Sequence, residues 1–236
     1  MKEYLNKIAT EIDILISNKQ IDQFEKFFDY LIEMNRVMNL TAITEPKEVV
    51  QKHFIDSISI MNYYKFQDSI SVIDVGTGAG FPGIPLAIMC PNVQFTLMDS
   101  LNKRIKFLNN IIELCELKNV TCIHSRAEDL GKNDEYREQY DVCVSRAVAN
   151  LSVLLEYCMP FVKVGGYFIS YKSILAEDEL IQSQNAQKKL SCSFDRKVLF
   201  KIPDTDYKRS FLFFEKKNIL NKKYPRQSGM PKKDPL

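Results

Sequence analysis

The chain has 236 residues, with 45% apolar and 26% charged side chains and a net charge of +2, which is the balance of an ordinary globular protein. No apolar run approaches the ~18–20 residues that a membrane-spanning helix needs. Residues 1–7 lack the apolar core of a signal peptide. We therefore expect a cytoplasmic protein with no membrane partner.

The six cysteines are scattered and form no Cys-x-x-Cys pair, which indicates free thiols in a reducing compartment rather than a disulfide framework. The chain has two histidines, His53 and His124, and they lack the spacing of zinc ligands. We expect no metal site.

Charge is distributed unevenly along the chain. Residues 216–236 hold seven basic side chains and one acidic side chain. A near-neutral body with a basic tail indicates an anionic partner that is met at one place.

Residues 1–64 are expected to form an N-terminal helical extension. Apolar residues in the stretch 21–32 recur at i, i+3, i+4 and i+7, which is one face of a helix. A further helix is expected to begin near Thr44, a candidate N-cap, with Pro46 in its first turn. Its core-facing residues would be Val49, Val50, Phe54, Ile58 and Met61.

From residue 65 to 216 the pattern predicts one α/β domain. Short β-branched runs predict strands at about 70–75, 93–99, 120–124, 140–145 and 166–171, with helices near 83–89, 101–116, 150–159 and 176–190. This alternation is typical of a mostly parallel sheet with helices on both faces. The last two strands, 197–202 and 210–214, have no room for a crossover helix, so they predict a C-terminal antiparallel hairpin. Residues 217–236 are expected to pack on this domain as a basic tail.

A glycine-rich loop follows the first expected strand. Four of the eight glycines, Gly76, Gly78, Gly80 and Gly83, lie within eight residues and precede a helix. Glycine permits positive φ and lets a ligand approach the backbone closely, so the loop predicts a seat for part of a cofactor.

Two features favour S-adenosylmethionine over a dinucleotide. Asp74, at the end of the first strand, would repel a pyrophosphate but could face a cationic amino-acid group or orient the loop. Pro82 and Pro85 remove two amide donors that a pyrophosphate would use. Asp99, at the end of the second strand, could accept both ribose hydroxyls in either cofactor, or cap the following helix.

Two further strand ends are candidate ligand contacts. The loop that contains Ala127 and Glu128 follows the third strand, where a backbone amide and a carboxylate could read an adenine edge. Arg146 ends the fourth strand and could pair with a carboxylate or a phosphate. A solvated acidic loop and a surface ion pair are the structural alternatives.

Taken together, several motifs resemble the ribosomal RNA small subunit methyltransferase G family, from about residue 20 to the end of the chain. The matching segments are Asn39-Leu-Thr-Ala-Ile43, His53-Phe-Ile-Asp-Ser57, residues 74–85, Ser145-Arg-Ala-Val148, Lys223-Tyr-Pro-Arg226 and residues 229–236. Ile58 replaces a usual leucine, and Gln227-Ser228 replaces a commoner lysine-plus-small pair.

The resemblance implies a Rossmann-like class I methyltransferase with a seven-stranded sheet. It implies transfer of a methyl group from S-adenosylmethionine to N7 of a guanine in bacterial 16S ribosomal RNA, free or in the small subunit. Family cofactor positions carry over to Gly76, Phe81, Ala127, Glu128 and Arg146, and we add Asp74, Gly78 and Asp99 from the residues themselves.

The N7 lone pair of guanine is already nucleophilic, so positioning can supply much of the catalysis, and we name no catalytic acid or base. The candidates for RNA contact are Lys172, Arg226 and Tyr224. Of these, the Tyr224 ring could stack on an unpaired base. His53 and Asp56, at i and i+3, are interpreted as a structural pair beside the cleft.

Two other functions stay open from the sequence, with a monomer expected in each case. A nicotinamide-dependent oxidoreductase would need a second nucleotide-binding half, whereas the expected sheet ends in a hairpin. An RNA-assembly factor that binds the cofactor without catalysis would need the same residues, and a turnover assay would distinguish it.

Overall fold

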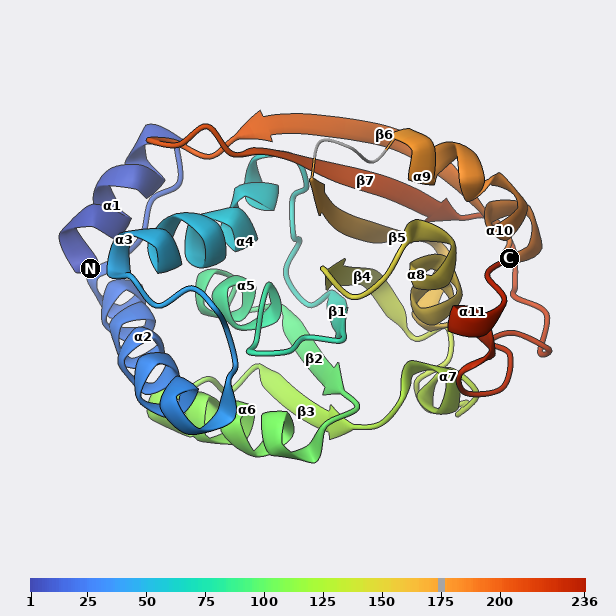
Figure 1. The fold of residues 1–236 in the computed structure, drawn as a ribbon, viewed down its shortest axis with the longest axis horizontal. Helices are drawn as coiled ribbons and strands as arrows, with labels where there is room; N and C mark the ends of the chain where they lie inside the picture. Colours follow the sequence, from blue (N-terminus) through green and yellow to red (C-terminus); the bar gives the residue numbers. More distant parts are fainter. Residues whose placement is uncertain (174–176) are drawn as a thin grey trace.

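A seven-stranded sheet runs through the middle of the molecule (Figure 1). The computed structural model describes residues 1–173 and 177–236. The spatial strand order is β3-β2-β1-β4-β5-β7-β6. The strands are β1 Ser71–Val75, β2 Gln94–Asp99, β3 Val120–His124, β4 Tyr140–Arg146, β5 Val162–Ser173, β6 Cys192–Lys201 and β7 Lys208–Lys216. β1 to β5 are parallel, and β7 pairs antiparallel with both β5 and β6. The predicted sheet and hairpin are confirmed.

The strand order places a ligand crevice. From β1 the chain moves to β2 and β3 on one side, and then returns to β4 on the other side of β1. The connections therefore diverge at the carboxyl ends of β1 and β4, which is where open α/β sheets bind ligands. Val72 to Val75 of β1 are all buried, as expected for a central strand covered on both faces.

The N-terminal part is helical, as predicted. It contains α1 Lys2–Glu11, α2 Asn18–Met38, α3 Pro46–Val49, a π-helical stretch Val50–Ile55, α4 Asp56–Ile58 and a 3-10 turn Ser59–Asn62. Glu45 caps α3 in place of Thr44, because its carboxylate accepts from the Glu48 amide at 3.0 Å. Four of the five expected core residues are fully buried, and Met61 is partly buried. α1 falls within the segment predicted to be helical, although no periodic pattern gave its bounds.

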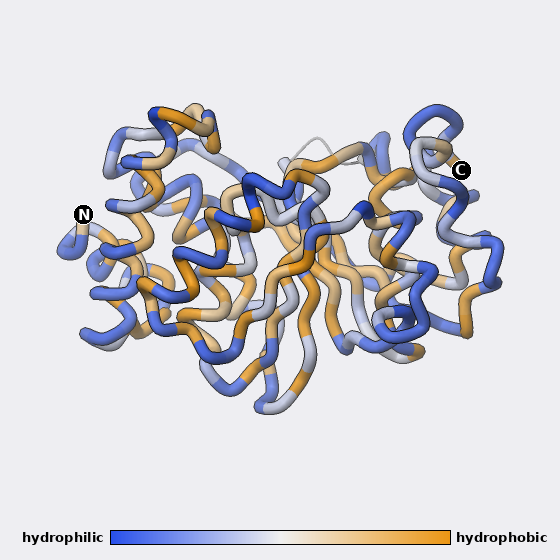
Figure 2. Tube along the Cα trace, turned by 90° about the horizontal axis from the view of Figure 1, so that it is seen from below, coloured by the Kyte–Doolittle hydropathy of each residue, from blue (hydrophilic) through white to orange (hydrophobic). Residues whose placement is uncertain are grey.

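Helices cover both faces of the sheet and enclose two apolar cores. The N-terminal helices lie on one face with α5 Gly83–Met89 and α6 Asn102–Leu114. The other face carries α7 Ala127–Leu130, α8 Leu151–Cys158, α9 Glu177–Gln182, α10 Gln184–Lys189 and the C-terminal α11 Met230–Lys233. Figure 2 shows apolar strands between these layers and hydrophilic residues along the outer loops.

The helix expected near 176–190 is divided at Ser183 into α9 and α10, and its first expected residue lies outside the described part. The division into 1–64, 65–216 and 217–236 stays a prediction, because both flanking segments pack against the sheet unit. Within the described part of the chain, no helix is both long enough and apolar enough to cross a membrane.

Candidate active site

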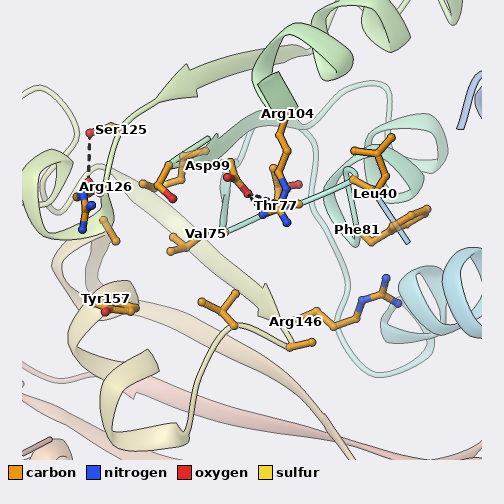
Figure 3. Close-up of a pocket in the computed structure, with 18 of the residues that line it drawn as sticks. Leu40, Val75, Thr77, Phe81, Asp99, Arg104, Ser125, Arg126, Arg146 and Tyr157 are labelled. Atoms are coloured by element: carbon orange, nitrogen blue, oxygen red, sulfur yellow. Dashed lines mark hydrogen bonds and ion pairs between the residues drawn. The ribbon is translucent and has the colours of Figure 1, made fainter. Parts of the chain in front are cut away.

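A cavity of about 490 Å³ lies at the carboxyl ends of β1, β2 and β4 (Figure 3). Seven of the eight residues predicted to bind a cofactor line it, and Asp74 does not. The seven are Gly76, Gly78, Phe81, Asp99, Ala127, Glu128 and Arg146. The topology therefore brings together residues that lie up to 70 positions apart in the sequence.

The floor of the cavity is the glycine loop. Gly76 has a φ of +72°, and a Cβ built there would lie 2.7 Å from Val148 Cγ2. Only glycine fits this position, both because of its left-handed backbone and because of the close approach of Val148. The loop is held from below by Met98, whose carbonyl accepts the Gly76 and Thr77 amides at 3.0 and 3.1 Å.

Asp74 orients this loop from beneath. Its side chain is fully buried and Oδ2 accepts the Gly83 amide at 2.9 Å. Burial raises the pKa of Asp74 to about 6, and the nearby Gly83 amide and Thr77 hydroxyl oppose that rise. Asp74 Oδ1 and Thr77 Oγ1 are buried, and neither meets the criteria for a hydrogen bond with another described residue. Of the two roles predicted for Asp74, the contacts favour loop orientation.

Asp99 joins the loop to the second strand. Its carboxylate is 3% exposed and accepts the Gly78 amide at 3.0 Å, the Leu101 amide at 2.9 Å and Arg104 Nη1 at 3.0 Å. Figure 3 shows Arg104 reaching over the cavity to this carboxylate. Asp99 lines the cavity and also holds the amide of Leu101, the N-cap residue of α6, which itself makes no side-chain cap bond. Its side chain fixes the entry to the helix without capping it.

Ala127 and Glu128 form the opposite end of the cavity, at the start of α7. Glu128 is 5% exposed, and Oε1 accepts the Gly229 amide of the C-terminal tail at 2.9 Å. Oε2 has no hydrogen bond among the described residues and is available to a ligand. Tyr157 of α8 faces the same end (Figure 3).

Arg146 belongs to a buried charged cluster rather than to the surface. Nη1 donates to Asp56 Oδ2 at 2.7 Å, and Nη2 donates to His53 Nδ1 at 3.2 Å. Arg209 Nε contacts the other Asp56 oxygen at 3.2 Å. The His53 ring stacks on Phe81 at 4.4 Å. Burial and then the Arg146 charge lower the pKa of His53 to about 3, so the ring stays neutral. His53 and Asp56 thus border the cleft as part of a structural cluster.

The N-terminal extension supplies one wall of the cavity, through Leu40, Thr41 and His53. Sequence reasoning placed none of these as ligand contacts. His53 lies in a π-helical stretch, a feature frequent at functional sites, but the periodicity of a sequence does not predict such a stretch. Leu40 and Thr41 lie in a loop, where no periodic pattern exists.

The residues predicted to contact RNA are mostly engaged inside the chain. Tyr224 is 4% exposed and packs in the second core. Its ring is not available to stack on a base, which corrects that expectation. Arg226 makes a bidentate contact with the fully buried Glu156 and also donates to the Asp234 carbonyl. Lys172 donates to the Ala149 carbonyl and to Glu179 at 2.7 Å, although it lines a second cavity.

Known proteins resemble this chain over nearly its whole length. A profile of the rRNA small subunit methyltransferase G family matches residues 20–207. Ribosomal RNA small subunit methyltransferase G of Lachnoclostridium phytofermentans is 48% identical over 221 residues, covering 94% of this chain and 91% of that protein. The protein of the same name from Clostridium kluyveri is 45% identical over 234 residues, covering 99% and 98%. The chain belongs to the ribosomal RNA small subunit methyltransferase G family.

More distant solved structures share the fold of this family member. M. jannaschii TYW2 in complex with AdoMet has a TM-score of 0.53 at 18% identity, covering 68% of this chain and 76% of that chain. A SAM dependent methyltransferase from Aquifex aeolicus has a TM-score of 0.54 at 16% identity, covering 72% and 94%. The predicted class I methyltransferase fold is confirmed. The chain is a methyltransferase, and S-adenosylmethionine is its cofactor.

The cavity fits this cofactor chemically. Asp99 offers a carboxylate for a ribose diol, and Val75, Met98 and Tyr157 offer apolar surface for a purine ring. Polar side chains, among them Ser100, Ser125 and Arg126, also line the cavity. The wall therefore offers contacts to a polar ligand.

Proposed function

We propose that this methyltransferase transfers a methyl group from S-adenosylmethionine to N7 of a guanine in 16S ribosomal RNA. The observation that carries the proposal is the state of the candidate bases. Asp99 and Glu128 are tied to backbone amides, and His53 has a pKa of about 3. His53 is therefore poorly matched to removing a proton near neutral pH, and the two carboxylates are already engaged as hydrogen-bond acceptors. Guanine N7 needs no deprotonation, so it suits this cavity.

A second cavity, of about 510 Å³, supports an RNA substrate. It shares His53, Arg146 and Ala147 with the first cavity, so the two are adjacent. Lys52, Lys172 and Arg209 also line it. Together with Arg146 there are four lining cations against two lining acids, Asp56 and Glu179. All four cations are in ion pairs, with Arg146 and Arg209 sharing Asp56, and the positive surplus of the lining favours an approaching phosphate backbone.

When bound, S-adenosylmethionine supplies an electrophilic methyl group on a sulfonium sulfur. The chain contributes position rather than proton transfer. Within the proposal, Asp99 holds the ribose, Glu128 and the Ala127 amide read the adenine, and Gly76 and Gly78 let the ligand approach the backbone. The Phe81–His53 stack stiffens the wall between the two cavities. Fixing two reactants in line contributes several kcal/mol to lowering a barrier.

We further propose that one chain acts alone in the cytoplasm, where small subunits are found. Light scattering of the purified protein should give the mass of one chain; a dimer mass at assay concentrations would contradict it.

The direct test is methyl transfer from labelled S-adenosylmethionine. The substrates are 30S subunits, protein-free 16S RNA and bulk tRNA from a strain that lacks this protein, with cleavage mapping of N7-methylguanine. We expect label at one guanine of the small-subunit RNA. Cofactor binding without transfer to any of the three substrates would favour the non-catalytic assembly factor instead.

A further inference from the structure

The loop between α2 and α3 is fixed tightly in place although it has no regular structure. Asn35 holds both backbone groups of Thr41: its Nδ2 donates to the Thr41 carbonyl at 2.9 Å, and its Oδ1 accepts the Thr41 amide at 2.8 Å. Asn39 turns the chain with a φ of 50°. Thr41 is therefore a positioned residue in the cavity wall, not a mobile one.

The proton of His53 can be placed from its neighbours. A guanidinium has only donors, so His53 Nδ1 must accept from Arg146 Nη2, at 3.2 Å. The neutral ring then carries its proton on Nε2. Nε2 lies 2.9 Å from Thr41 Oγ1, so His53 donates and Thr41 accepts.

The Thr41 hydroxyl oxygen also accepts the Ile43 amide at 3.0 Å. A hydroxyl has two acceptor lone pairs and one donor hydrogen. Both lone pairs are used, and the O–H has no acceptor among the described residues. Because Thr41 lines the first cavity, the unused hydrogen is directed to whatever occupies that cavity. Hydrogen bonds with Asn35, His53 and Ile43 therefore hold Thr41 in place and leave its hydroxyl free only to donate.

We propose that the Thr41 hydroxyl donates a hydrogen bond to O6 of the acceptor guanine and so selects guanine over adenine; this rests on the proposed function. His53 and Arg146 are positioning residues in this arrangement, since they act through Thr41.

The position of Thr41 and the hydrogen-bonding groups of guanine both indicate that O6 is the acceptor for the Thr41 hydroxyl. Ile43 and His53, which bond to Thr41, line the second cavity, so Thr41 stands where the two cavities meet. An acceptor base must reach this junction to approach a donor in the first cavity. N7 and O6 lie on the same edge of guanine and both accept hydrogen bonds, whereas adenine presents an amino donor at the corresponding position. A donor hydroxyl there attracts guanine and opposes adenine.

The test compares substrates that differ only at this atom. The 16S RNA is assembled by ligation with either guanine or 2,6-diaminopurine, which replaces O6 by an amino group, at the mapped target position. For Thr41→Val we expect the ratio of kcat/KM between guanine and diaminopurine RNA to fall about tenfold from the wild-type ratio. Thr41→Ser should restore the ratio to within about threefold. Thr44→Val, the same change at an exposed threonine of the same loop, should leave it unchanged.

Two results would overturn the inference. A purely structural role would lower both kcat/KM values in parallel and leave the ratio unmoved. A tenfold loss of S-adenosylmethionine affinity by calorimetry would mean that the hydroxyl serves the cofactor. Failure of wild-type protein to methylate any guanine would instead remove the proposed function, which is a separate result.

A measurement on the unsubstituted protein guards against misfolding of the variant. The chain has two histidines, so ¹⁵N imidazole spectra with His124→Gln for assignment isolate His53. We expect a neutral ring protonated on Nε2 at pH 6. A proton on Nδ1 would turn the Thr41 hydroxyl toward His53 and contradict the proposal.

Discussion

The two segments that flank the sheet reach the cavity in different ways. The N-terminal extension contributes side chains, among them Leu40, Thr41 and His53. The C-terminal tail contributes a backbone amide, from Gly229 to Glu128. Arg137 of the sheet unit holds the tail in place, because it donates to the carbonyls of residues 220, 221 and 224, and also to that of Gly131.

This difference shows that a basic composition does not by itself make a binding surface. Three of the seven basic residues in 216–236 are in ion pairs within the chain: Lys216, Lys217 and Arg226. Lys216 is fully buried. The segment with the smaller net charge forms the wall of the ligand site, and the strongly basic one serves as its support.

Deleting residues 222–236 should have the largest effect. The deletion leaves the buried Glu156 without Arg226, and an unpaired buried charge costs about 3–5 kcal/mol. It also removes the Gly229 amide from Glu128. We expect a large loss of stability in urea unfolding and loss of S-adenosylmethionine binding in calorimetry. A truncated protein with normal stability and cofactor affinity but weak RNA binding would mean that the tail acts as an RNA contact only.

The extension should be the acid-sensitive segment. Unfolded His53 takes up a proton near pH 6.5, whereas the folded ring stays neutral until about pH 3. The unfolded state therefore binds one more proton in this window, and stability falls as the pH drops from 6.5 toward 3. One proton is equivalent to about 1.4 kcal/mol per pH unit. Between pH 6.5 and 5, the free energy of unfolding of the wild type should therefore fall by up to about 2 kcal/mol more than that of His53→Gln. Equal slopes in urea unfolding would contradict this, with His124→Gln as the control.

Between the two segments, the sheet supplies Asp99. We expect Asp99→Ala to weaken S-adenosylmethionine at least tenfold, about 1.4 kcal/mol, because two ribose hydroxyls lose their charged acceptor. Arg104→Gln is a matched control, since it removes the ion pair but leaves the carboxylate. Calorimetry decides, and unchanged affinity in Asp99→Ala would refute the ribose role.

The smallest effect should come from the exposed lysines of the tail. Replacing Lys222, Lys223, Lys232 and Lys233 by glutamine keeps the anchoring contacts, so stability should stay within about 0.5 kcal/mol. RNA affinity should fall a few-fold with a flatter dependence on salt, because phosphate contacts release counterions. Salt-dependent filter binding measures this slope; an unchanged slope would place the RNA contacts elsewhere.

Local patterns predicted the parts of the site that local sequence controls. The glycine loop directly follows β1 and Asp99 is the last residue of β2, and parallel strands bring their carboxyl ends to one edge. The hairpin was predictable because the turn between its strands is too short for a crossover helix.

The rest depends on partners that are remote in the sequence. Arg226 meets Glu156 seventy positions away, and no charge count shows that pairing. Tyr224 is buried because the tail folds back onto α8, which composition does not encode. Thr41 becomes a donor only through His53 and Arg146, and Arg146 lies 93 positions from His53. The sequence predicted that Asp74 lies near the end of the first strand. Its burial beneath the glycine loop could be seen only in the packed structure.

The contact between Gly229 and Glu128 also couples the folding of two segments, because the two residues lie 101 positions apart in the sequence. Glu128 lines one end of the first cavity, and its carboxylate gains this hydrogen bond only when the tail has docked. Docking of the tail and completion of that end of the ligand site are therefore one folding event.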